Sequence, residues 1–173
     1  MTQTAVNTII DAGKEWELST TQLGAISETL IAAQLMLVSD GRFSTFTPQA
    51  DDDGIDLILL DKETRKTIPI QIKAAFMAKD RPRSTVQFDT RLKTFRKLEG
   101  TYVLCLAIDR QSAAINWLWL IPTEDLASVS NATATKLAIS PSTKPNSKDR
   151  YTPYRFDRIG KVVEKLVEDG RKV

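Results

Sequence analysis

The chain has 173 residues, of which 42% are apolar, so it is long enough to bury a full hydrophobic core. It has no histidine and one cysteine, which excludes Ser-His-Asp and Cys-His catalysis, Cys/His metal sites and a disulfide framework. The net charge of +2 conceals an asymmetry, because residues 1–61 carry two basic and ten acidic side chains whereas residues 62–99 carry eleven and four. Any metal must therefore be held by oxygen, which favours Mg²⁺ or Mn²⁺.

The N-terminal sequence does not resemble a secretion signal, since no basic region is followed by an apolar segment and a small-residue cleavage site. No run of about 18 apolar residues occurs. We therefore expect a cytoplasmic protein that does not span a membrane, folded as a single domain over 1–173 with a core at about 20–122 and a C-terminal extension at 123–173.

The first clear element is a long helix that is capped by one of the hydroxyl residues at 19–21 and ends at Gly41. Its apolar residues surround nearly the whole helix, which predicts that the helix is buried. Glu28 is the only charged residue between 23 and 38 and projects on an apolar side. Because an isolated buried carboxylate is costly, Glu28 needs a cation, a salt bridge to Arg or Lys, or access to water at the helix edge.

Three strands follow the helix. Residues 42–48 alternate in strand fashion, and residues 55–60 and 67–76 form a hairpin that is apolar on both faces. Such strands are covered on two sides, which predicts an α/β sandwich. The aspartates at 51–53 either bind a metal directly or form an exposed turn, and the turn is favoured because adjacent like charges repel.

Three polar side chains interrupt the apolar hairpin. Gln71 and Lys73 are two residues apart in one strand, so they project from the same face. A turn near residues 63–64 brings Asp56 opposite about residue 71 and hence onto that face, whereas a slip of one residue would put it on the other. This register decides whether the three side chains meet.

The most basic segment is 77–99. It predicts a short strand at 86–88 and a helix at 90–98. The basic side chains of that helix are candidates for contacts with nucleic-acid phosphates, although a solvated amphipathic helix would look the same. These residues are Arg91, Lys93, Arg96 and Lys97.

Two apolar strands, 101–108 and 115–121, complete the core. Trp117 and Trp119 alternate with leucines in the second strand and are expected to pack against the sheet. The aromatic and arginine residues of 150–156 either touch nucleic acid or pin the last helix at 157–168, and pinning is favoured.

The order of these elements resembles the core of the PD-(D/E)xK nuclease superfamily, the restriction-endonuclease-like fold. The resemblance covers about residues 20–110 and rests on Glu28 in the first helix, Asp56 after Gly54-Ile55, and Gln71-Ile72-Lys73. It implies an αβββαβ core with a central mixed sheet flanked by helices. Glutamine at position 71 departs from the carboxylate that most members have there.

By this resemblance, Asp56, the amide oxygen of Gln71 and the carbonyl of Ile72 would bind Mg²⁺ or Mn²⁺, and Glu28 would bind it directly or through water. Lys73 would orient or help deprotonate the attacking water. The resemblance implies a metal-dependent endonuclease that cleaves DNA, often as a homodimer so that both strands are cut. The alternatives are a catalytically inactive nucleic-acid-binding or complex-forming subunit with the same fold, and a structural interaction domain.

Overall fold

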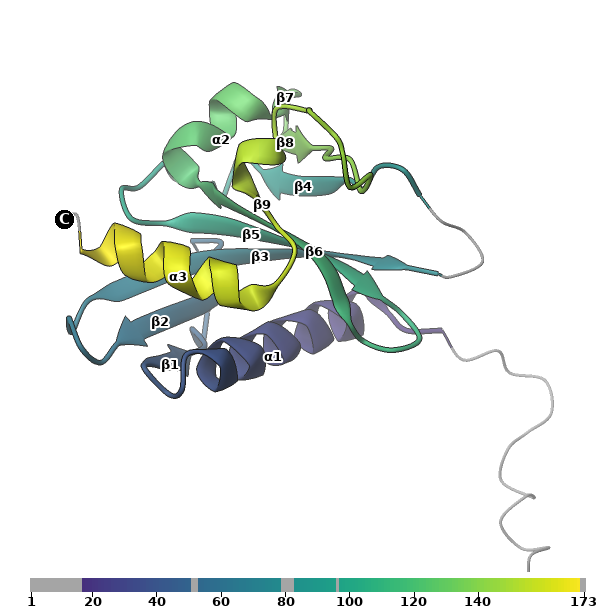
Figure 1. The fold of residues 1–173 in the computed structure, drawn as a ribbon. Helices are drawn as coiled ribbons and strands as arrows, with labels where there is room; N and C mark the ends of the chain where they lie inside the picture. The colour runs from purple at the N-terminus through teal and green to yellow at the C-terminus, as the bar shows by residue number, and fades with distance from the viewer. Residues whose placement is uncertain (1–16, 51–52, 79–82, 96, 172–173) are drawn as a thin grey trace, which may run out of the picture.

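A six-stranded mixed sheet forms the centre of the fold, with strand order β1-β2-β3-β5-β6-β9 (Figure 1). The computed structural model describes residues 17–50, 53–78, 83–95 and 97–171. β3 and β5 are parallel, and the other neighbours are antiparallel. The strands are β1 (Phe43–Phe46), β2 (Leu57–Asp61), β3 (Thr67–Met77), β5 (Tyr102–Asp109), β6 (Ile115–Pro122) and β9 (Arg155–Phe156). The predicted α/β fold with a central mixed sheet is confirmed.

Two layers cover the sheet. Helices α1 (Thr20–Val38) and α3 (Ile159–Gly170) lie on one side, and helix α2 (Thr123–Val129) lies on the other with a small second sheet (Figure 1). The small sheet has the order β4-β8-β7. Its strands are β4 (Phe88–Arg91), β8 (Lys136–Ile139) and β7 (Asn131–Ala132), and a 3₁₀ turn, η1, spans Thr152–Tyr154.

Each face of the central sheet has its own hydrophobic cluster, because side chains alternate along the strands. The first cluster joins Ile70 and Leu104 to α1 and α3, and the second joins Val103 and Trp119 to α2, β4 and β8. All but the last residue of β5 are buried. Strands that are apolar on both faces therefore lie in the centre of the sheet, as predicted.

Helix α1 begins as predicted but is less buried than predicted. Ser19 forms a capping box with Gln22, in which each side chain accepts a hydrogen bond from the other residue's backbone N–H. Only three residues of the helix are fully buried, and Leu37 is 76% exposed. The prediction of burial all round is wrong because α1 packs one stripe on β1, β3 and α3, and no other described element covers its outer face. Composition alone does not show how many layers lie over a helix.

The same exposure bears on the membrane prediction. By length and composition, Thr20–Val38 is the one helix in the described part of the chain that is apolar enough to cross a bilayer, a criterion that core helices of globular folds also meet.

The helix predicted at 90–98 is wrong. Residues 88–91 instead form β4, and residues 92–94 form a turn. β4 pairs with β8, with Phe88 opposite Ile139 and Arg91 opposite Lys136. The spacing of Leu92 and Phe95 is a local pattern that favours a helix. The pairing of β4 with β8 joins residues that are distant in the sequence, and it determines the structure here.

Residues 150–156 hold the C-terminal part of the chain on the central sheet. β9 pairs with β6, and the Arg155 guanidinium lies 4.8 Å from the centre of a Trp117 ring. Arg155 also donates hydrogen bonds to the carbonyls of Lys144 and Pro145. Trp119 is fully buried. The predicted packing of both tryptophans is therefore confirmed, and β9 also contacts α3, as expected of a segment that pins the last helix.

A buried ion pair fixes the turn between β2 and β3. Asp61 is 2% exposed and accepts hydrogen bonds from Arg42 at 3.0 and 2.7 Å and from the Glu63 N–H at 3.0 Å. Burial disfavours its charged form, but these hydrogen bonds outweigh that effect and hold the pKa of Asp61 below its ordinary value. The Asp61 carboxylate therefore stabilises the fold in its charged state.

Asp61→Asn is expected to remove a stabilisation that depends on pH. Because the folded-state pKa is the lower one, this stabilisation is present above the unfolded-state pKa of about 4 and is lost as the pH falls through the folded-state pKa. The difference in unfolding free energy between wild type and Asp61→Asn should be largest near pH 7 and shrink below about pH 4. Urea unfolding across this pH range measures it, and a difference that does not vary with pH would contradict the role assigned to the charge.

Candidate functional site

Asp56 directly precedes β2, beside the part of β3 that extends beyond β2. Leu57 pairs with Ile70, so the predicted register of the hairpin is confirmed. The Asp56 N–H donates to the carbonyl of Ile70 at 3.0 Å, and the Asp56 carboxylate accepts the N–H of Ile72 at 2.6 Å. The carboxylate thus accepts a backbone N–H of β3 that an additional residue at the start of β2 would otherwise have paired with. It lies at the edge of the sheet, level with the backbone of β3.

This edge carries a second oxygen. The N–H and C=O of one residue in a strand point to the same side, so the carbonyl of Ile72 faces the edge to which its N–H donates. β2 pairs only as far as Ile70, whereas β3 continues to Met77. A carboxylate and a backbone carbonyl therefore share an edge that β2 leaves open. Both are ligands that hard divalent cations accept.

Gln71 and Lys73 project from the same face of β3, as predicted. Their neighbours in β5 are Val103 and Cys105, which belong to the second hydrophobic cluster. Lys73 is half-buried, and its charge acts on the Cys105 thiol. Burial raises the pKa of that thiol, which is consistent with the inert buried cysteine that the sequence predicts.

The side chain of Gln71 is buried against the loop that leads into Asp56. It is 7% exposed and borders a cavity of about 20 Å³. The fit is close, because a Cβ atom on Gly54 would lie 2.7 Å from the Gln71 amide nitrogen. Gly54 also has a φ of +67°, a conformation that side chains other than glycine rarely adopt. Apart from the glycine itself, no pattern in the sequence predicts that position 54 requires a residue without a side chain.

Glu28 approaches the sheet from the opposite face. It continues the buried stripe of Ile31 and Leu35 toward the start of α1, and it is half-buried. Its carboxylate lies back over Gly24, 3.8 Å from where a Cβ on that glycine would be. The structure thus places the Asp56 carboxylate on the Ile72 N–H, and Gln71 and Lys73 on one face of the same strand. Convergence of Glu28 with them stays a prediction.

Part of the basic segment packs over the side chain of Gln71. Thr94, Phe95 and Leu98 line the Gln71 cavity. Arg91, Lys93 and Lys97 are exposed on the same segment, whereas Arg96 lies outside the described residues. The segment that carries Arg91, Lys93 and Lys97 therefore contacts the Gln71 cavity, a proximity that the predicted helix does not indicate.

The described carboxylates elsewhere in the chain do not form a second candidate metal site. No group of three such side chains in the described ranges is arranged to hold a metal ion. Asp53 is exposed, which agrees with the predicted turn, and Asp51 and Asp52 lie outside the described residues. The donors at the β3 edge are instead a mixture of carboxylate, amide and backbone oxygens.

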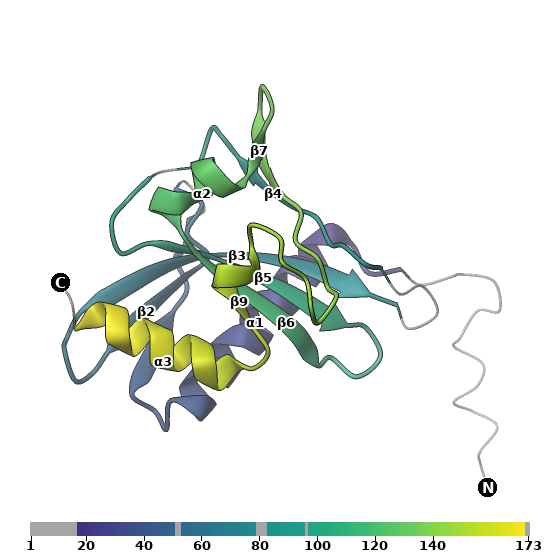
Figure 2. The same cartoon turned by 45° about the horizontal axis from the view of Figure 1, so that its top comes forward.

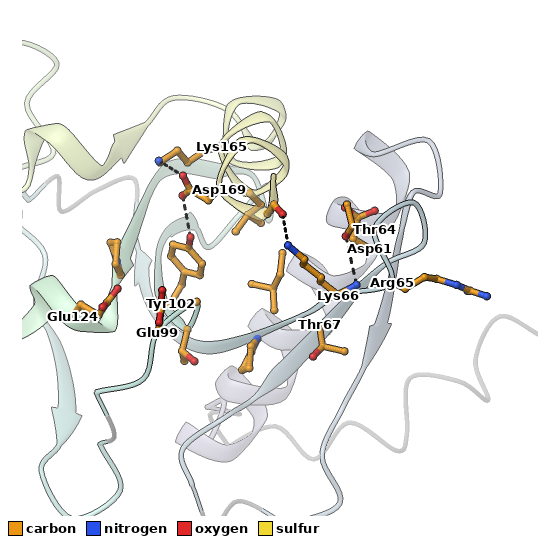
Figure 3. A pocket seen from close by; sticks show the side chains of 17 residues that line it. Asp61, Thr64, Arg65, Lys66, Thr67, Glu99, Tyr102, Glu124, Lys165 and Asp169 are labelled. Atoms are coloured by element: carbon orange, nitrogen blue, oxygen red, sulfur yellow. Dashed lines mark hydrogen bonds and ion pairs between the residues drawn. The ribbon is translucent and has the colours of Figure 1, made fainter. Parts of the chain in front are cut away.

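A much larger hollow, of about 840 Å³, lies at the other end of β3 (Figure 3). Tyr102 donates its hydroxyl to Asp169 at 2.9 Å, Lys165 bonds Asp169 at 2.6 Å, and Lys66 donates to the carbonyl of Gly170 at 3.0 Å. Burial, aided by the Asp169 carboxylate, raises the pKa of Tyr102. Cations and anions are mixed along these walls, so the hollow lacks the one-signed charge that phosphate or a metal ion would need.

Comparison with known proteins gives a likeness of fold. No family model matches the sequence, and no curated protein sequence matches it. The structure is similar to that of a bacterial homing endonuclease, I-Ssp6803I, with a TM-score of 0.56, 17% sequence identity, and coverage of 91% of this chain and 100% of that chain. The likeness is one of fold: the α/β architecture around Asp56 and Gln71 is similar to that of this homing endonuclease.

Proposed function

We propose that the protein is a metal-dependent endonuclease that hydrolyses phosphodiester bonds in DNA, a PD-(D/E)xK nuclease with Gln-x-Lys in its third strand. The observation that carries the proposal is the Asp56 carboxylate, held at the edge of β3 by the N–H of Ile72, the residue between Gln71 and Lys73. The similarity of the fold to that of a homing endonuclease supports it.

The edge position explains how groups from two faces could act on one phosphate. Gln71 and Lys73 project from one face, and Glu28 faces the sheet from the other. The Asp56 carboxylate bonds the backbone of β3 between these two faces. Asp56, Ile72, Gln71 and Glu28 would together supply the oxygen ligands for Mg²⁺ or Mn²⁺.

The chemistry requires both a cation and a base. A bound divalent cation offsets charge on the pentavalent transition state and lowers the pKa of water. Lys73 would orient the water and assist loss of its proton as the new P–O bond forms. The P–O bond to the leaving sugar would break as this bond forms; the proton of the attacking water would pass to solvent, and the leaving oxygen would take up a proton from a solvent water.

Metal binding is expected to depend on Asp56. Titration calorimetry with Mn²⁺ should detect binding to wild-type protein. Asp56→Asn should weaken it by more than the roughly 10- to 100-fold that is typical when a residue outside the ligand shell is lost. Gln71→Glu should tighten binding, because a carboxylate adds a negative charge.

A matched control is Asp157→Asn, which removes an exposed carboxylate paired with Lys161 on α3. It should bind Mn²⁺ as wild type does. Wild-type affinity in Asp56→Asn would overturn the assignment of this ligand.

A non-catalytic DNA-binding or complex-forming subunit is the second candidate. The observation that favours it is Gln71, which gives the site one fewer negative charge than a carboxylate would. This candidate predicts DNA affinity that falls with salt, carried by Arg91, Lys93, Arg96 and Lys97, with no effect of metal. DNA binding without cleavage in Mg²⁺ or Mn²⁺ would support it. The proposed homodimer is tested separately by analytical ultracentrifugation.

A further inference from the structure

We propose that the small sheet β4-β8-β7 reads base sequence in a groove of the DNA, a few base pairs from the Asp56 site. This inference rests on the proposed function. It adds a sequence-reading surface to the phosphate contacts predicted for the basic segment.

The small sheet has one apolar and one polar face. Phe88, Thr90, Leu137 and Ile139 alternate inward and are at most 4% exposed. The residues between them point away from the core, and the strand pairings place them side by side. This outer face consists of Gln87, Asp89, Arg91, Lys136, Ala138 and Asn131.

The chemistry of the outer face matches the edges of bases. Arg and Lys bond guanine, Asn and Gln bond adenine, Asp accepts from cytosine, and alanine can contact the thymine methyl group. Its one apolar member, Ala138, is small, so the face would not serve to dock a hydrophobic partner. Because Lys136 pairs with Asp89, the exposed Arg91 gives the face one net positive charge, which suits a polyanion.

Hydrogen bonds hold these side chains in position. Asp89 bonds Lys136 at 2.5 Å and Gln87 at 3.1 Å. Arg150 donates to the side-chain oxygen of Asn131 at 2.6 Å, which leaves the Asn131 amide N–H₂ to donate to a base. Side chains that are already ordered lose less entropy when they bind.

The outer face is carried on a shape that fits a groove. The turn between β7 and β8 protrudes from the body of the protein (Figure 2). Two paired strands lie about 4.8 Å apart, and the major groove, about 12 Å wide, admits a two-stranded ribbon. The polar face of this hairpin can therefore enter the groove while the apolar face stays in the core.

The reading surface is close to the candidate site. The small sheet covers the same face of the central sheet as Gln71 and Lys73. From Arg91 the chain needs only three residues to reach Thr94, which lines the Gln71 cavity. Three residues span at most about 11 Å, or roughly three base pairs at 3.4 Å each. Bases read by the Arg91 end of this face should therefore lie near the cleaved bond.

The test is selection of preferred sequences from a random duplex library by the full chain, followed by binding and cleavage of preferred and shuffled duplexes. Asn131→Ala should reduce the ratio of affinities for preferred and shuffled DNA by roughly 5- to 100-fold. Lys97→Ala, a phosphate-contact variant, should weaken both duplexes equally and make the salt dependence shallower by about 0.9 in log–log slope. Gln87→Ala provides a second reading variant if Asn131→Ala does not fold, as judged by circular dichroism.

The outcomes separate the two proposals. Wild-type sequence preference in both Asn131→Ala and Gln87→Ala overturns the reading role while cleavage remains. Cleavage by wild type without any sequence preference also overturns it. Failure of the wild type to cleave any duplex in Mg²⁺ or Mn²⁺ overturns the proposed endonuclease instead, and a sequence preference in binding would then still support the reading surface.

Discussion

Lys73→Ala is expected to reduce DNA cleavage by roughly 100- to 10,000-fold, the range typical when a positioned proton-transfer group is lost. Lys73 is the half-buried cation two residues from Gln71, on the part of β3 that pairs with β5 from Ile70 to Met77. A water molecule held at the Asp56 edge would lose its orienting partner. Single-turnover cleavage of plasmid DNA in Mg²⁺ measures the rate, and thermal unfolding monitors the fold.

Lys161→Ala is the matched control, because it removes a lysine that pairs with Asp157 on α3. It should cleave at the wild-type rate. DNA affinity should survive in Lys73→Ala, since the predicted phosphate contacts lie on the basic segment. Wild-type cleavage by Lys73→Ala would exclude this lysine from the chemistry.

Gly54→Ala is expected to damage both stability and activity. The new Cβ would lie 2.7 Å from the Gln71 amide nitrogen, and alanine would have to adopt a φ of +67°. The positive φ alone costs about 1–2 kcal/mol. The collision adds to this cost and displaces either Gln71 or the loop before Asp56. Urea unfolding and cleavage rates measure the two effects.

Gly41 and Gly100 separate strain from collision. Their φ angles are +73° and +70°, and a Cβ on either would meet nothing within 4 Å. Gly41→Ala and Gly100→Ala should therefore show the backbone cost and keep wild-type cleavage. If Gly54→Ala matches these controls in both stability and cleavage, the close fit around Gln71 contributes to neither.

The parts of the fold that depend on neighbouring residues were predictable from the sequence. The capping box at Ser19 and the pairing of Leu57 with Ile70 follow from local signals, namely a cap residue and a short turn. The alternation around Gln71 and Lys73 follows from the two-residue repeat of a strand. The candidate site was therefore predictable as far as one hairpin defines it.

The parts set by distant residues were not predictable in the same way. β4 forms because β8 pairs with it, and the intervening sequence contains β5, β6 and α2. The exposure of Leu37 depends on how many elements cover α1. The burial of Gln71 depends on the loop segment that contains Thr94 and packs over its side chain. Each is decided by chain segments whose proximity no local pattern records.

The parallel pairing of β3 with β5 also has a consequence for folding kinetics. The two hairpins, β2–β3 and β5–β6, can form locally, but Gln71 acquires its neighbour Val103 only when they join. Such non-local pairing requires closure of a long loop and is slow. Because the site is complete only after this step, a ligand that needs the whole site would slow unfolding without accelerating folding.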